Sequence, residues 1–245
     1  MANNPITGAT YLLQGLKLIL RPGIRRYALI PLLINIVFFV GLWVLGMGAL
    51  DDAQAALIDR LPNWLAWLHW LLVPLFYVAG LIIVYFTFVL FANLFAAPFN
   101  GLLAEAVERE LTGRSARPMA WSDALKDLGT SVSSEVRKFL YFAPRALAIL
   151  LLFLIPVVNL GAPVLWALFG AWMLAIGYLD YPMANHSLPF PVQRAQARTK
   201  RWLALGFGGA VMVALLVPVV NLVVVPSAVA GATALWVNHL RDQDT

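Results

Sequence analysis

The residues best suited to bind an ion form the segment 21–26, Arg-Pro-Gly-Ile-Arg-Arg, directly before the first long apolar stretch. Proline is favoured where helices begin, glycine permits a tight turn, and the free amides of a helix N-terminus carry partial positive charge. Two adjacent guanidinium groups add planar donors that suit a tetrahedral oxyanion such as sulfate or phosphate. We therefore interpret Gly23, Ile24, Arg25 and Arg26 as a candidate anion site. The alternative is that the arginines only orient a membrane helix, a role that would not need the glycine.

A second polar group lies where the next apolar stretch ends. Pro98 interrupts backbone hydrogen bonding there, and Asn93 and Asn100 can satisfy the backbone groups that it releases. Glu105 can pair with Arg109 one helical turn later. We expect a structural kink at this point, and we treat these four polar residues as candidates for a pathway or a charged gate, or for a subunit contact.

Asp180, Asn185 and His186 lie close together further along the chain. Their spacing is only weak evidence for a metal or a proton relay, and a loop that caps a hairpin is the favoured interpretation. The sequence contains no GxxxxGK[ST], HExxH or GxSxG pattern and no cysteine. We therefore expect no enzyme activity, no metal site and no cofactor.

The composition excludes an ordinary soluble protein. The 245 residues are 62% hydrophobic and 12% charged, whereas soluble domains have about 25% charged residues. Four stretches contain no Asp, Glu, Lys or Arg: residues 27–50, 61–104, 146–179 and 203–240. Each is long enough to enter a membrane as helix, and none alternates as a β-barrel strand would. The net charge of +5 comes from basic residues beside these stretches, so we expect no nucleic-acid partner.

The distribution of charge predicts the topology. Arg21, Arg25 and Arg26 precede the first stretch, whereas the segment 51–60 after it holds three Asp and one Arg. Basic residues favour the cytoplasmic side, so the N-terminus is predicted to be inside and segment 51–60 outside. The polar segment 105–145 and the basic residues between 194 and 201 are then cytoplasmic. Both termini are predicted to lie in the cytoplasm.

An internal repeat shapes the last two stretches. IPVVNLGAP at 155–163 recurs as VPVVNLVVVP at 217–226, and two prolines bracket each copy. Each stretch is therefore predicted to form a helix, a turn and a helix, with arms of about 13 to 15 residues that reach roughly 20 Å. Because this is shorter than a bilayer core, re-entrant hairpins are favoured over four thin spans. Asn159 and Asn221 would cap the turns, or line a pathway. Two hairpins need shelter from lipid, which predicts an oligomer.

The predicted fold class is an all-α integral membrane protein with two spanning helices, two re-entrant hairpins and amphipathic surface helices. It forms a single membrane domain, residues 1–245. Its parts are an amphipathic N-terminal helix (1–21), a first and a second spanning helix (22–50 and 61–98), cytoplasmic helices (99–145), hairpin 1 (146–180), a cytoplasmic connection (181–201) and hairpin 2 (202–240).

Several of these segments resemble the CysZ family of bacterial sulfate permeases over essentially the whole chain. They are PGIRR at 22–26, FANLFAAPFNGLLAE at 91–105, YLDYPMANH at 178–186, LGFG, and PVVNLVVVPSAVAGATALW ending at Trp236. The resemblance implies ATP-independent sulfate uptake across a bacterial inner membrane for cysteine synthesis, partly penetrating hairpins and a homo-oligomer. It also implies that a Gly-Leu-Arg turn binds sulfate, here Gly23, Ile24 and Arg25 with Arg26. Ile24 replaces the family's leucine, a change of little consequence if backbone amides bind the anion.

We expect a permease or channel whose partners are sulfate, the lipid bilayer and further copies of the chain. A non-transporting scaffold or accessory subunit of another transporter is the alternative, and an enzyme acting on lipid ranks third. The number of subunits, the pore route, ion coupling and selectivity among sulfate, sulfite and other oxyanions stay open at this point.

Overall fold

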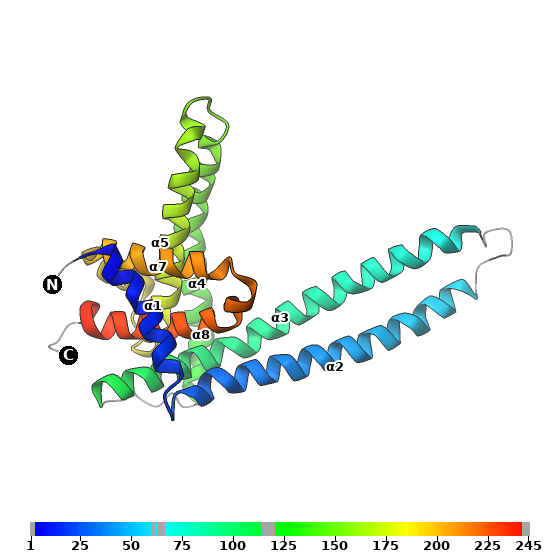
Figure 1. The fold of residues 1–245 in the computed structure, drawn as a ribbon, viewed down its shortest axis with the longest axis horizontal. Helices are drawn as coiled ribbons and strands as arrows, with labels where there is room; N and C mark the ends of the chain where they lie inside the picture. Colours follow the sequence, from blue (N-terminus) through cyan, green and yellow to red (C-terminus); the bar gives the residue numbers. More distant parts are fainter. Residues whose placement is uncertain (1–2, 60–61, 63–66, 114–120, 242–245) are drawn as a thin grey trace. The chain divides into compact units, whose positions relative to one another are not determined.

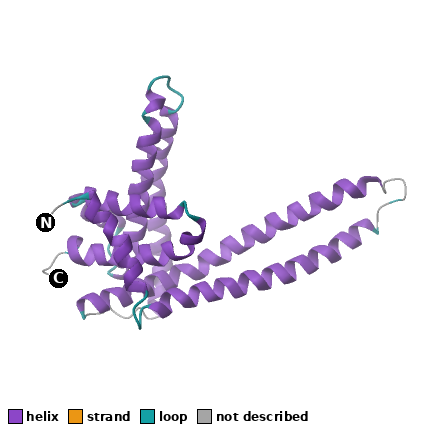
Figure 2. Cartoon of the chain, viewed as in Figure 1, coloured by secondary structure: helices purple, strands orange, loops and turns teal. Residues whose placement is uncertain are grey.

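A computed structural model of the chain describes residues 3–59, 62, 67–113 and 121–241. Every regular element among these residues is helical (Figure 2), so the predicted all-α class is confirmed for this part of the chain. Four helical segments are long and apolar enough to cross a membrane: Arg25–Ile58, His69–Phe91, Ala162–Asn185 and Val223–Leu240. The chain divides into two compact units, Leu29–Phe99 and Met1–Ala28 with Asn100–Thr245.

The unit Leu29–Phe99 contains most of two long helices, α2 (Arg25–Ile58) and α3 (His69–Thr112), which run antiparallel (Figure 1). None of the residues of α2 is buried, and Val37 and Leu45 are 71% and 75% exposed. A helix that is apolar on all sides and not covered by protein requires lipid around it. Composition and exposure therefore agree that this unit is embedded in a bilayer.

The two helices of this unit contact each other along their length. The rings of Phe38 and Phe88 stack with centroids 6.3 Å apart. Gly80 lies against Leu50, where any Cβ atom would meet the leucine side chain. Near the far end, Tyr77 Oη donates a hydrogen bond of 2.5 Å to Asp51 Oδ1.

The ends of both helices differ from the predicted bounds. α2 continues through Asp51 and Asp52 to Ile58, where the sequence predicted an external loop. α3 does not break at Pro98 but continues to Thr112. A proline removes one amide donor and displaces one carbonyl, which can bend a helix without ending it. The predicted cytoplasmic helices 99–145 therefore begin with the last turns of α3.

The second unit contains the other elements. They are α1 (Pro5–Ile19), the last turns of α3, α4 (Trp121–Leu152), the short 3-10 helix η2 (Val158–Leu160), α5 (Ala162–Asn185), α6 (Phe190–Thr199), α7 (Arg201–Leu215), α8 (Pro218–Leu235) and the π-helical turn η3 (Trp236–Leu240). Figure 1 shows α4 and α5 as a hairpin that projects from the other helices of this unit, with its turn at the far end.

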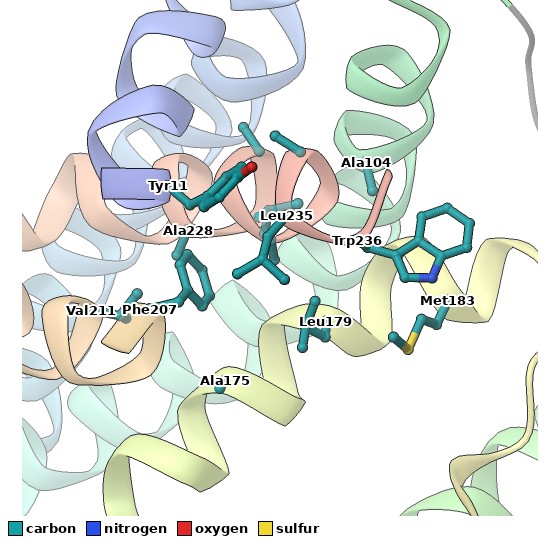
Figure 3. Packing of buried hydrophobic residues seen from close by; sticks show 14 of the residues in the cluster. Tyr11, Ala104, Ala175, Leu179, Met183, Phe207, Val211, Ala228, Leu235 and Trp236 are labelled. Atoms are coloured by element: carbon teal, nitrogen blue, oxygen red, sulfur yellow. The ribbon is translucent and has the colours of Figure 1, made fainter. Parts of the chain in front are cut away.

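Helix α8 forms the centre of this unit. Ala228, Val229 and Leu235 have no exposed surface. Figure 3 shows Tyr11 of α1 and Phe207 of α7 close to Ala228 and Leu235. A helix that is apolar on all sides belongs in a membrane or in a protein core. For α8 the protein itself supplies much of the cover, since 67% of the segment Val223–Leu240 is buried.

Helix α1 lies within the predicted N-terminal helix and packs on α7 and α8. Its face with Tyr11 and Leu18 is buried, whereas Ile6 and Leu13 are 74% and 60% exposed. A Cβ atom at Gly15 would overlap the carbonyl oxygen of Ser227, so this glycine sets the close approach to α8. One face of this amphipathic helix is thus covered by protein, and its other face still exposes apolar side chains.

The two predicted hairpins have unequal forms. In hairpin 1, α4 ends at Leu152 and α5 begins at Ala162, with the turn between them. In hairpin 2, α7 ends at Leu215 and α8 begins at Pro218, so the turn precedes the repeat and Pro226 lies inside α8. Helix α5 has 24 residues, longer than the predicted arm of about 13 residues. The re-entrant depth of both hairpins stays a prediction.

Candidate anion site

The candidate anion site lies in the turn between α1 and α2. Helix α1 ends at Ile19, residues 21–24 turn, and α2 begins at Arg25. Gly23 has φ +93°, a conformation that side chains disfavour, and nothing lies within 4 Å of the position its Cβ would occupy. The glycine is therefore required by the backbone angle and not by lack of space.

Two amides of this turn are already used within it. Ile24 N and Arg25 N both donate to Arg21 O, at 3.2 and 3.1 Å. Pro22 has no amide hydrogen, and among the described residues the amides of Gly23 and Arg26 have no acceptor. An anion that approached the turn would therefore find its backbone donors at Gly23 and Arg26, a narrower set than the sequence predicted.

The side chains of the turn have two roles: Ile24 packs into the protein, and Arg25 and Arg26 remain exposed. Ile24 is 2% exposed and belongs to the hydrophobic core, so it holds the turn onto the protein. Arg25 and Arg26 are exposed, and neither pairs with a carboxylate in the described part of the chain. Arg26 Nη2 lies 3.1 Å from Tyr27 Oη, and its guanidinium carbon lies 4.9 Å from the Tyr27 ring. Both guanidinium groups keep donors available to a ligand.

Arg21 ties the turn to the end of α3. Its Nη1 lies 3.0 Å from Glu110 Oε1, with both side chains about half exposed. An exposed ion pair of this kind contributes about 0.2 to 1 kcal/mol. This ion pair matters mainly for position, because it holds Arg21, the first residue of the turn, against α3, which is itself anchored.

That anchor is Glu108, which the sequence analysis did not select. Glu108 is 1% exposed, and its carboxylate contacts His186 Nε2 at 2.9 Å and Arg241 Nη1 at 2.8 Å. His186 ends α5 and Arg241 follows η3, so one carboxylate joins the bases of both hairpins. Removing one partner of a buried ion pair leaves an uncompensated charge, which costs about 3 to 5 kcal/mol.

The burial of Glu108 could have been predicted from helical spacing. Ala104 and Val107 are both fully buried, and Glu108 follows Ala104 by one helical turn, so it lies on the same face. The predicted pair Glu105 and Arg109 occupies the other side, 4.0 Å apart at Arg109 Nη1 and Glu105 Oε1, with side chains 20% and 49% exposed. The predicted contact exists, and its role as a gate or subunit contact stays a prediction.

The other predicted pathway residues lie in different places. Asn100 Nδ2 is 3.2 Å from Tyr181 Oη, which joins α3 to α5. Asn159 lies in η2 at the exposed turn of hairpin 1, and this turn forms the projecting end of the hairpin in Figure 1. The side chains of Asn93 and Asn221 lie outside the described residues. Of the predicted set, Asn93, Asn100, Glu105 and Arg109 all belong to α3.

The segment 180–186 is helical to Asn185, not the predicted loop. Asp180 accepts from Lys138 Nζ at 2.6 Å, whereas Asn185 Nδ2 donates to Gly101 O at 2.9 Å. His186 contacts Glu108 instead, so these side chains have separate partners. Among the described residues, no group of three His, Asp or Glu side chains could hold a metal ion.

Comparison with known proteins identifies the family. The sequence model of the family described as Sulfate transporter CysZ/Etoposide-induced protein 2.4 matches residues 11–226 of the chain. The chain belongs to this family. A protein named sulfate transporter CysZ from Pseudomonas paraeruginosa is 47% identical over 235 residues, which cover 96% of both chains. Its namesakes from Pseudomonas aeruginosa and Pseudomonas fluorescens are each 46% identical over 235 residues, with 96% and 94% of their chains covered. The predicted resemblance to CysZ is confirmed.

The part of the chain that matches the CysZ family includes the anion turn and two members of the buried ionic cluster. Gly23, Glu108 and His186 all lie within residues 11–226, whereas Arg241 follows the last matched residue. Arg241, the second partner of Glu108, therefore comes from a C-terminal segment beyond the residues that the family model matches.

Proposed function

We propose that this CysZ-family chain carries sulfate across a bacterial inner membrane as an ATP-independent permease or channel that supplies sulfur for cysteine biosynthesis. The observation that carries the proposal is the 46 to 47% identity to proteins named sulfate transporters, over 96% of the chain. Four helical segments long and apolar enough to cross a membrane support it. The described residues contain no cluster suited to a metal-dependent reaction.

In this proposal the turn of Gly23, Ile24, Arg25 and Arg26 captures the anion. Gly23 and Arg26 supply free amides, and the two guanidinium groups supply charged donors to sulfate oxygens. Ile24 contributes its position in the core rather than a contact with the anion. Each charged hydrogen bond contributes about 1.5 to 3 kcal/mol, less at an exposed site, where salt screens the charge.

The exposure of this turn suits transport. A transported ion must bind strongly enough to enter and weakly enough to leave. An open turn in which Arg25 and Arg26 pair with no carboxylate among the described residues concentrates sulfate at the protein surface without enclosing it. Such a turn acts as the entrance of a route and not as a storage site.

Topology and assembly complete the proposal. The arginines before α2 favour a cytoplasmic turn, with both termini on that side. The exposed turn of hairpin 1 would need shelter for its backbone groups inside the bilayer, which favours a homo-oligomer. Asn93, Asn100, Glu105, Arg109, Asn159 and Asn221 remain the proposed pathway or gate residues.

Uptake of labelled sulfate into liposomes tests the function. Purified protein should accelerate uptake down a sulfate gradient without ATP, and the double variant Arg25→Ala/Arg26→Ala should lose most of the uptake and of equilibrium sulfate binding. Arg198→Ala is the matched control, because Arg198 is also an exposed arginine without an ion pair among the described residues. Absence of uptake by the unaltered protein would favour the scaffold alternative, and unchanged binding by the double variant would remove the assigned site.

A further inference from the structure

Two arginines outside the anion turn share one aromatic ring. The Arg145 guanidinium carbon lies 3.9 Å from the ring centroid of Tyr141, and that of Arg194 lies 4.8 Å from the same centroid. Arg145 and Tyr141 belong to α4, whereas Arg194 belongs to α6. Two like charges are thus held together by cation–π contacts, each worth about 0.5 to 2 kcal/mol.

Neither charge is neutralised by a carboxylate among the described residues. Arg145 Nη1 donates to the carbonyl oxygen of Tyr141, and Arg194 makes no ion pair there. Asp180 pairs with Lys138 at 2.6 Å. Because a guanidinium group has five donors, each arginine retains several that have no acceptor in the part of the chain that the structure describes. Two such groups around one ring form a site for an oxyanion.

The ring that holds them is itself fixed. Tyr141 is 8% exposed, and Trp172 Nε1 donates to its hydroxyl group at 3.3 Å. The ring of Phe190 packs edge-on against it, with centroids 5.7 Å apart. The arginines therefore rest on a platform built by α4, α5 and α6, which gives them a more defined position than two surface side chains would have.

The sequence places this platform at the edge of the apolar surface. Arg145 is the last charged residue before the uncharged stretch 146–179. Leu147 and Leu151, which follow on α4, are 58% and 52% exposed. Six residues of helix rise about 9 Å, so the guanidinium groups lie near the level of lipid phosphates when these leucines contact acyl chains.

We propose that Arg145 and Arg194, held on the ring of Tyr141, bind the phosphodiester of an anionic phospholipid at the base of hairpin 1. A basic pair beside aromatic rings and exposed leucines fits a ligand that has an anionic head and apolar tails. The same guanidinium groups also suit a soluble oxyanion such as sulfate or phosphate, to which they would donate hydrogen bonds. The exposed leucines beside them favour the lipid. This site is distinct from the turn of Gly23–Arg26 and does not depend on the transport proposal.

Native mass spectrometry of the full-length protein, purified in detergent with phosphatidylglycerol, tests the proposal. The unaltered protein should retain phosphatidylglycerol in preference to phosphatidylcholine. Added phosphatidylglycerol should also raise the temperature at which the protein unfolds. Arg145→Gln/Arg194→Gln should weaken retention about tenfold or more, since charged hydrogen bonds are lost. Arg198→Gln, one helical turn after Arg194 on α6, should retain the lipid. If the double variant does not fold, Arg194→Gln alone should show a smaller loss in the same direction.

Three results would overturn the proposal. Equal phosphatidylglycerol retention by the unaltered protein and by the folded arginine variants would show that the pair does not bind it. An equal loss in Arg198→Gln would show that total charge matters and not the pair on Tyr141. Displacement of the lipid by millimolar sodium sulfate or phosphate, but not by sodium chloride at equal ionic strength, would assign the pair to a soluble oxyanion.

Discussion

Two stretches with the same five residues lead into helices that have opposite surroundings. Residues 156–160 and 218–222 both have the sequence Pro-Val-Val-Asn-Leu. The first lies in the turn of hairpin 1, where Val157 has φ +72° and is 80% exposed and Leu160 is 81% exposed. The second begins α8, which a few residues later is buried at Val224 and Ala228. A short apolar sequence therefore does not determine whether the helix that follows it meets lipid or protein.

The difference comes from the residues that follow each copy. After the first copy, α5 carries large side chains such as Leu165 and Trp166, which are 44% and 41% exposed. After the second, α8 carries Ala228, Gly231 and Ala232, which let α1 and α7 approach closely. Small residues allow a helix to be enclosed by others, so hairpin 2 forms the core of its unit and hairpin 1 presents its apolar side chains outward.

The largest effect is expected where the two hairpins are joined. Glu108→Ala removes the carboxylate that contacts His186 and Arg241, and should lower the free energy of unfolding by about 3 to 5 kcal/mol. Glu110→Ala, which breaks the exposed pair with Arg21, should lower it by about 1 kcal/mol or less. Thermal unfolding in detergent compares the two. Equal losses would mean that Glu108 does not hold the hairpins together.

A matched leucine pair compares burial in the two hairpins. Leu235→Ala, in α8 without exposed surface, should lower the free energy of unfolding by about 2 kcal/mol through lost packing. Leu160→Ala, at the exposed turn of hairpin 1, should change it by about 0.5 kcal/mol or less. The unfolding midpoints of both variants in one detergent provide the measurement. A large loss at Leu160 would show that hairpin 1 is covered by protein in the assembled state.

A glycine pair sharpens the same contrast. Gly15→Ala places a methyl group against Ser227 O where α1 crosses α8, and should destabilise the protein by about 1 to 3 kcal/mol. Gly177→Ala, in α5 with no atom near the new methyl group, should be neutral or stabilise by up to about 1 kcal/mol. Unfolding temperatures again distinguish the two, and a neutral Gly15→Ala would contradict the close helix approach.

Spin labels at the two turns compare their depth without altering stability. The chain has no cysteine, so Leu160→Cys and Leu216→Cys each introduce a single thiol at an exposed turn position, 81% and 77% exposed in the native residues. Both labels should collide more with oxygen than with a water-soluble nickel complex if both bends lie in lipid. The label at 160 should lie deeper, because hairpin 1 projects from its unit. Dominance of the nickel complex at both positions would place the bends in water.

Particular residues show how far sequence reasoning reached. Gly23 was predicted to turn the chain before α2, and its φ of +93° confirms the need for glycine. The replacement of the family's leucine by Ile24 was expected to matter little for anion binding, and the structure adds that Ile24 is buried and anchors the turn. Glu105 was selected because its pair with Arg109 is visible in the local sequence, whereas the partner of Glu108, Arg241, comes from the far end of the chain. Partners this distant follow from tertiary packing alone.

The sequence by itself determined the solvent of this protein, its helical class, the glycine turn before α2 and its family. These properties depend on composition, on local backbone preferences and on motifs, all of which lie within short segments. Only the tertiary structure decided which copy of the repeat leads into an enclosed helix, which acidic residue is buried and which two arginines share a tyrosine ring. Each of those outcomes depends on helices from distant parts of the chain, and apolar segments of similar composition fit lipid and protein equally well until the shapes of their neighbours are known.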